Sequence, residues 1–265
     1  MKARWSWGAL MLVSLLALAG AQTPSNRFKS LVQQVAPSIV TVRAVVKLDV
    51  KSKEGSSSEE IKFSQRGAVI SEDGIIMMSS TLLTSESLKQ LLDLDPEDAD
   101  KVDMKISPQS FKIIFERESQ EYEAKLVATD SQLGLAFLKI ENLQGRTVKP
   151  IVFKDSPLEI GSELFCITRM PKGYDFTPYL MKVVVVAEVD KPRRAYLTDR
   201  STDELGLPVC NAEGVAVGVV TTIRPTVVNP DENDLGFDSG ALGSIFPIAV
   251  VQSVIDQAIQ LARSQ

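Results

Sequence analysis

The segment EYEAKLVATDSQLGLAFLKI, residues 121–140, contains short strand-like runs of a kind that occurs along most of the chain. Two runs with strand-like composition, 121–129 and 135–140, flank a short polar turn that ends at Gly134. Short apolar runs bounded by turn-forming residues are typical of β-strands. The segment therefore predicts two neighbouring strands.

Similar strand patterns continue in both directions, at intervals of roughly 8–12 residues. One of them, residues 67–78, predicts a hairpin around Asp73-Gly74, because Asp-Gly favours the tight turns that join antiparallel strands. Helical spacing of apolar residues is found near the two ends, at 26–35 and 247–263. This arrangement favours a β-barrel or β-sandwich over alternating βαβ units. The other predicted strands are 39–47, a stretch from residue 61, 111–116, 150–153, 162–169, 179–189, 194–198, 207–211 and 215–222.

Three polar segments interrupt the strands. Residues 51–60 are rich in Ser and predict an exposed loop. Residues 84–108 predict a short helix followed by an acidic loop, which together form an exposed acidic insertion. Residues 224–240 predict a long turn-rich loop; within it, Asp231–Gly236 is similar to a calcium loop but lacks two of the expected oxygen ligands, so a solvated loop is favoured.

The first 21 residues have the pattern of a secretory signal peptide. Lys2 and Arg4 precede the apolar run 8–19, and Ala19-Gly20-Ala21 fits a cleavage site. The alternative is a membrane anchor, but the apolar run is shorter than the roughly 20 residues that a spanning helix needs. We expect cleavage after Ala21 and export to a periplasm or to the extracellular space, with no membrane span in the mature chain.

The composition excludes several kinds of site. A net charge of −5 argues against a nucleic-acid partner, which normally requires a basic face. The chain contains no histidine, so the commonest general base and the commonest zinc ligand are both missing. Its two cysteines cannot complete a zinc site alone. We therefore predict no cofactor and no metal, and composition alone rules out Ser-His-Asp and Cys-His chemistry.

Six segments, in order, resemble the HtrA (DegP/DegQ) branch of the trypsin-like serine proteases. They are VAPSIVTV (35–42), GAVISEDGIIMMSSTLL (67–83), the segment 121–140, KDSPL (154–158), LTDRSTDELGLPVCNAEGVAVGVVTT (197–222) and FPIAVVQSVIDQ (246–257). The resemblance implies an all-β fold of two six-stranded antiparallel β-barrels, with a short N-terminal helix and a C-terminal helix. The expected domains are an N-terminal barrel at 22–145 and a C-terminal barrel at 146–265.

The same resemblance implies that the catalytic triad has been lost. The family's His, Asp and Ser positions fall on Thr81, Gly134 and Leu205. Asp203 and Glu204 replace the Gly-Asn of the family's oxyanion loop, which places negative charge where the transition state would need positive charge. The sequence therefore predicts a proteolytically inactive homologue.

Two other side chains are candidate nucleophiles. Thr81 could act with Lys139 or Lys89 as its base, but exposed lysines and a packing threonine are the simpler interpretation. Cys210 could act as a thiolate, but its place in a strand favours the core or a disulfide. The resemblance brings the strands of Cys166 and Cys210 side by side, so a disulfide between them is a candidate in an exported protein.

The favoured function is binding without catalysis. By resemblance, an extended polypeptide would add to strand edges near the 224–240 loop and near Val219, Val220, Thr221, Thr222 and Ile223. This mode of binding needs no triad. The expected partner is an unfolded polypeptide or a specific protein, including an active paralogue that this chain would regulate. Two alternatives remain: an HtrA-type serine endopeptidase in envelope protein quality control, and a structural component of envelope assembly that uses residues 84–108 as its contact.

Overall fold

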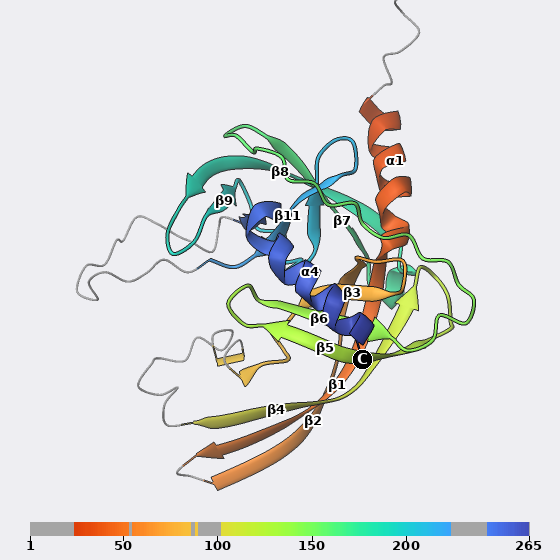
Figure 1. Cartoon of the computed structure of the whole chain (residues 1–265), viewed down its shortest axis with the longest axis vertical. Helices are drawn as coiled ribbons and strands as arrows, with labels where there is room; N and C mark the ends of the chain where they lie inside the picture. Colours follow the sequence, from red (N-terminus) through yellow and green to blue (C-terminus); the bar gives the residue numbers. More distant parts are fainter. Residues whose placement is uncertain (1–23, 53–54, 86–87, 90–101, 224–242, 265) are drawn as a thin grey trace, which may run out of the picture.

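The structure, a computed structural model, describes residues 24–52, 55–85, 88–89, 102–223 and 243–264. Its strands form two closed barrels of six strands each, in which every pairing is antiparallel, and helices lie near both ends of the described chain (Figure 1). The predicted all-β fold with two barrels and terminal helices is therefore confirmed. The predicted signal peptide, most of the predicted acidic insertion and the predicted loop that contains Asp231–Gly236 lie outside the described residues.

The first barrel has the strand order β1-β2-β3-β6-β5-β4. Apolar side chains from these strands fill it, among them Val42, Met78 and Leu138, none of which is exposed. Its strands are β1 (Ile39–Ser52), β2 (Gly55–Val69), β3 (Ile75–Ser79), β4 (Asp103–Phe115), β5 (Tyr122–Asp130) and β6 (Leu135–Ile140).

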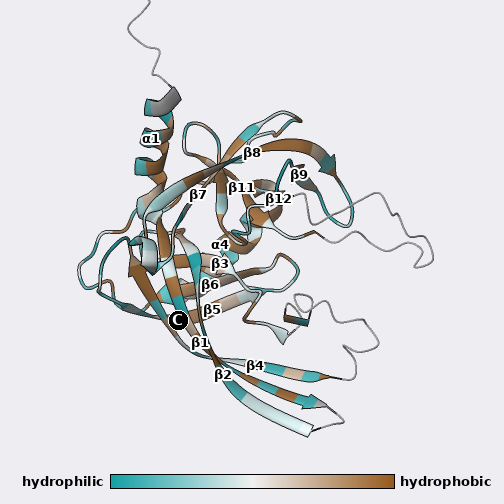
Figure 2. Ribbon diagram, turned by 180° about the vertical axis from the view of Figure 1, so that it is seen from behind, coloured by the Kyte–Doolittle hydropathy of each residue, from teal (hydrophilic) through white to brown (hydrophobic). Residues whose placement is uncertain are grey.

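Two predicted loops were wrong in part. Residues 55–60 continue β2, which pairs with β1 without interruption from Ile39–Ala68 to Ser52–Gly55. Residues 103–108 belong to β4, which pairs with the other edge of β1. Figure 2 shows that the outer part of β2 is hydrophilic, which is why its composition suggested a loop. Main-chain hydrogen bonds with β1 form the strand regardless of its polar side chains.

The second barrel has the order β10-β11-β12-β9-β8-β7. The predicted strand at 150–153 is not formed; only Phe153 makes a single bridge, to Ala216 of β11. The strands are β7 (Glu163–Arg169), β8 (Pro178–Val189), β9 (Ala195–Thr198), β10 (Pro208–Cys210), β11 (Ala216–Thr221) and β12 (Gly243–Pro247).

The two helices pack into apolar clusters that contain residues of both barrels. Helix α1 (Pro24–Val35) packs Leu31 and Val35 against the core of the second barrel. Helix α4 (Ile248–Ser264) contributes Val251 and Ile255 to an apolar cluster that also holds residues of β3, β6 and β11. None of the helices in the described ranges is long and apolar enough to cross a membrane. The two barrels therefore share buried apolar contacts.

Candidate functional site

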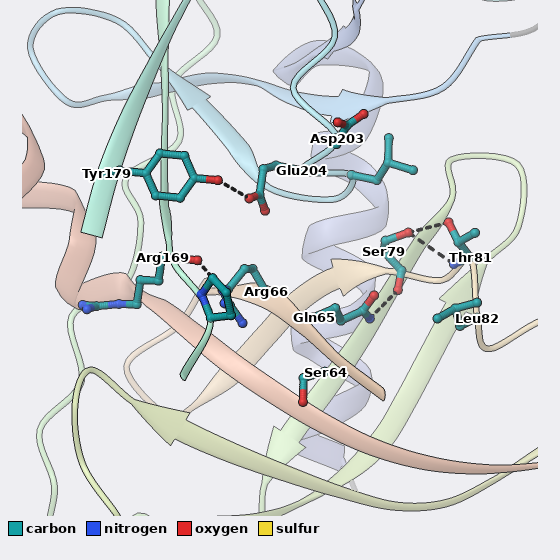
Figure 3. A pocket seen from close by; sticks show the side chains of 12 residues that line it. Ser64, Gln65, Arg66, Ser79, Thr81, Leu82, Arg169, Tyr179, Asp203 and Glu204 are labelled. Carbon is teal, nitrogen blue, oxygen red and sulfur yellow. Dashed lines mark hydrogen bonds between the residues drawn. The ribbon is translucent and has the colours of Figure 1, made fainter. Parts of the chain in front are cut away.

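A pocket of about 450 Å³ lies between the two barrels. The first barrel supplies one wall from β2 and from the segment that follows β3, and the second barrel supplies the other from β7, β8 and the loop before β10 (Figure 3). Its lining residues are Ser64, Gln65, Arg66, Ser79, Thr81, Leu82, Arg169, Pro171, Tyr179, Asp203, Glu204 and Leu205.

Thr81 and Leu205, which the sequence singled out from opposite halves of the chain, both line this pocket. They reach the same pocket because Gly206 packs directly against the end of β3. A Cβ atom at Gly206 would lie 2.3 Å from the backbone nitrogen of Ser79, and Gly206 has φ +80°. Only glycine fits this close approach in a left-handed conformation. The backbone itself therefore brings the two segments together.

Gly134 reaches the site only through its main chain. Its carbonyl oxygen accepts a hydrogen bond of 2.9 Å from the backbone nitrogen of Ser80, next to Thr81. Gly134 is not among the residues that line the pocket, and a Cβ atom built on it would meet nothing within 4 Å. This turn positions the segment after β3 but contributes no side chain.

The hydroxyl of Thr81 has a structural partner. Thr81 Oγ1 and Ser79 Oγ lie 2.7 Å apart, and the backbone nitrogen of Thr81 also donates to Ser79 Oγ. Lys139 instead pairs with Asp73 at 3.1 Å, and Lys89 does not line the pocket. Among the described residues, no lysine lines the pocket beside Thr81.

The loop before β10 brings two carboxylates to the pocket. Glu204 Oε1 accepts a hydrogen bond of 3.0 Å from the hydroxyl of Tyr179. Burial raises the pKa of Glu204, although the Tyr179 hydrogen bond and the charge of Arg66 oppose that rise. Burial and the neighbouring Glu204 raise the pKa of Tyr179 to about 12, so its hydroxyl remains a donor at neutral pH. Asp203 is exposed and has φ +54°.

Two arginines, Arg66 of β2 and Arg169 of β7, also line the pocket. Arg66 donates to the carbonyl oxygens of Arg169 and Met170 and to Thr41 Oγ1. Arg169, only 5% exposed, donates to the carbonyl oxygens of Ala36, Ile39 and Phe176. Burial lowers the pKa of both guanidinium groups, yet arginine stays charged at physiological pH. These bonds join the barrels across the junction.

The sequence did not single out Tyr179, Arg66 or Arg169. A charged residue at the end of the otherwise apolar strand 162–169 was the available signal for Arg169. Nothing local marks Arg66 or Tyr179, because their partners are distant in the sequence.

Fewer residues are available for main-chain pairing with a peptide than the predicted binding edge contains. Val219 pairs with Pro208 of β10 and with Phe246 of β12. The backbone nitrogen and oxygen of Val220 are also used, by Leu207 and Gly206. Thr221 still pairs with β12, opposite Ser244. Only Thr222 and Ile223 lie beyond the strands described here, so Val219 and Val220 have no free edge for a peptide.

The candidate disulfide is not formed. Cys166 and Cys210 are both free and buried. Cys166 lies opposite Val209, and Cys210 lies opposite Phe165. Since successive residues of a strand point to opposite faces, this register separates the two sulfur atoms. Burial also raises the pKa of Cys210 to about 12, which argues against a reactive thiolate.

No group of three His, Cys, Asp or Glu side chains suited to a metal ion occurs within the described part of the chain.

A family model for the trypsin-like peptidase domain matches residues 65–219, which is more than half of the chain. The chain belongs to the trypsin-like peptidase family. No curated protein matches it significantly.

The trypsin-like domain match covers both walls of the pocket. It begins at Gln65 in β2 and ends at Val219 in β11, and so includes Thr81 and the Asp203–Leu205 loop. Trypsin-like enzymes combine a serine nucleophile, a histidine base and an aspartate that orients the histidine. This chain has the trypsin-like scaffold but contains no histidine.

Proposed function

We propose that this trypsin-like protein, similar to the HtrA branch, is exported, binds polypeptides between its barrels and does not cleave them. One observation carries the proposal: the pocket between the barrels is present, while Thr81 and Leu205 line it in a chain without histidine. In this proposal Thr81, Gly134 and Leu205 stand at the positions of the triad.

The chemistry at these positions supports inactivity. Leu205 has no heteroatom that could attack a carbonyl carbon. The Thr81 hydroxyl is hydrogen-bonded to Ser79, and the described lining of the pocket includes neither histidine nor lysine. In a serine protease, loss of the triad lowers turnover by about 10⁶-fold. A replacement nucleophile would also need a neighbouring general base, and Lys139 is instead paired with Asp73. The raised pKa of Cys210 disfavours the thiolate that it would need as a nucleophile.

The loop before Leu205 argues in the same direction. Serine proteases stabilise the transition-state oxyanion with hydrogen-bond donors in a site of suitable polarity. Asp203 and Glu204 line the pocket together with Leu205, so in this proposal their carboxylates stand where the family has its oxyanion loop. Their charge would repel a developing oxyanion, whereas it does not prevent a bound polypeptide from occupying the pocket.

The proposed partner is an unfolded polypeptide, or a segment of a specific protein such as an active paralogue. The pocket opens between the barrels, and Thr222 and Ile223 continue from β11 beyond its paired residues. An extended segment held by main-chain hydrogen bonds would need neither the triad nor a cofactor. Export, proposed from residues 1–21, would bring the protein to partners outside the cytoplasm.

The test uses purified protein, fluorescently labelled unfolded casein and a fluorophosphonate probe. We expect casein to bind without being cleaved, and no residue to be labelled by the probe. An active trypsin-like protease serves as the positive control. Covalent labelling of one residue, lost when that residue is substituted, would show that the protein is an enzyme. Failure to bind casein or any other unfolded polypeptide would refute the binding role.

A further inference from the structure

The outer part of β2 is the edge of a sheet. β2 pairs with β1 along its whole length, but it pairs with β3 only from Gly67 to Val69. Within the described parts of the chain, no other strand pairs with residues 56–66. Figures 1 and 2 show this part of β2 at one margin of the sheet that β1, β2 and β4 extend outward from the first barrel. Its outward main-chain N–H and C=O groups can therefore pair with a further strand.

The opposite margin of this sheet, formed by β4, is less suited to pairing. β4 meets β5 only at Phe111–Ile113 and continues outward from there to Asp103. Pro108 lies in this outer part and has no N–H group to donate to a neighbouring strand. The segment Ser56–Ser64 of β2 contains no proline. A further strand is therefore more readily added to β2 than to β4.

The side chains of β2 differ between the two faces of the sheet. Ile61 lies opposite Val46 of β1, and both Ile61 and Phe63 pack against the apolar core of the first barrel. Glu60 and Lys62 lie on the other face, because successive residues of a strand alternate. Both are exposed, and their side chains form an ion pair of 3.0 Å. Since directly opposed residues share a face, an added strand must match this alternation of charged and apolar residues.

A second copy of β2 matches this alternation in one register. When two copies run antiparallel with Ile61 opposite Ile61, Glu60 of each copy lies opposite Lys62 of the other. A register centred on Glu60 would oppose two glutamates, and one centred on Lys62 would oppose two lysines, which destabilises cross-strand pairing. A register centred between two residues would oppose the charged face to the apolar face. Charge and face together therefore select the register centred on Ile61.

We propose that two copies of this protein associate by antiparallel pairing of β2, from Ser58 to Ser64 of each copy, in the register centred on Ile61. The contact is isologous, with the same segment used by both copies around a twofold axis. Main-chain hydrogen bonds give the affinity, and the two ion pairs between Glu60 and Lys62 fix the register. The surface is separate from the polypeptide binding proposed above, and either can hold without the other.

Analytical ultracentrifugation of the purified protein over a range of concentrations measures this association. We expect a reversible monomer–dimer equilibrium. Glu60→Lys and Lys62→Glu should each weaken the dimer about tenfold, since each change places two like-charged pairs across the edge. The double variant Glu60→Lys/Lys62→Glu exchanges the charges and should restore the dimer. Glu159→Lys is the matched control, because Glu159 is exposed and lies before β7 in the second barrel; association should be unchanged.

A cysteine crosslink tests the register. Ile61→Cys should form a disulfide-linked dimer under mild oxidation, because directly opposed Cα atoms lie about 4.5–5.5 Å apart in an antiparallel pair, within reach of a disulfide. Ser57→Cys is the control. Residue 57 lies opposite Gln65 in this register, so its two copies are roughly 27 Å apart along the strands and should not crosslink. The native Cys166 and Cys210 are buried and should not contribute.

A protein that stays monomeric at every concentration would overturn the proposal, and the charges of Glu60 and Lys62 would then only keep the edge unpaired. A dimer that survives both single charge reversals, or that crosslinks as well through Ser57→Cys as through Ile61→Cys, would refute this contact. Restoration of the dimer by the double variant cannot come from a loss of folding, since a poorly folded chain would not regain it.

Discussion

The close approach of Gly206 to β3 makes a quantitative prediction about Gly206→Ala. The new methyl group would lie 2.3 Å from the backbone nitrogen of Ser79 and 2.6 Å from the carbonyl carbon of Met78. These are backbone atoms, so neither can rotate away. The left-handed backbone, with φ +80°, adds about 1–2 kcal/mol for a residue other than glycine. Steric overlap in packed surroundings adds about 1–3 kcal/mol more. We expect a loss of roughly 2–5 kcal/mol in the free energy of unfolding.

Gly134→Ala is the matched control for this prediction. Gly134 also has a left-handed backbone, with φ +68°, but a Cβ atom there meets nothing within 4 Å. It should lose only the conformational part, about 1–2 kcal/mol. Urea unfolding of both variants, followed by circular dichroism and extrapolated linearly to water, gives the two values. If Gly206→Ala is no less stable than Gly134→Ala, the contact between Gly206 and β3 does not hold the pocket together as described.

Three further predictions concern stability and its dependence on pH. Arg169→Met should lower the free energy of unfolding by about 3–5 kcal/mol, because it removes three buried hydrogen bonds from a charged donor to carbonyl oxygens. A change below 1 kcal/mol in urea unfolding, as expected for the exposed control Arg27→Met, would contradict this. Hydrogen bonds from Ser71, Lys139 and Arg263 outweigh burial and hold the pKa of Asp73 well below its usual range. Asp73 therefore contributes stability above the ordinary carboxyl pKa that is lost as the pH falls, and Asp73→Asn should flatten the acid limb of the melting temperature measured against pH. Glu204 has the opposite sign, since its raised pKa removes stability as the pH rises above the ordinary carboxyl value; Glu204→Gln should melt at a higher temperature at neutral pH, and an unchanged or lower melting temperature would be evidence against a strained carboxylate.

Most strands and the two terminal helices could be predicted from the sequence, because they depend on the local spacing of apolar residues. The hairpin around Asp73-Gly74, the paired runs of 121–140 and the apolar face of 247–263 all appear as expected. The two barrels could be predicted only from the resemblance of six segments, in order, to the trypsin-like proteases. Polarity was a poor guide at residues 55–60, because main-chain pairing with β1 does not require apolar side chains.

The sequence by itself determined what chemistry is missing: no histidine exists anywhere in the chain, and no fold can supply one. Only the tertiary structure decided which groups gather in the pocket. Arg66 bonds to a residue 103 positions away, and Arg169 to one 133 positions away. The register that separates Cys166 from Cys210, and the pairing that uses the edge of Val220, likewise depend on strands that meet from distant segments. Such contacts arise from the packing of whole elements, and no short window of sequence encodes them.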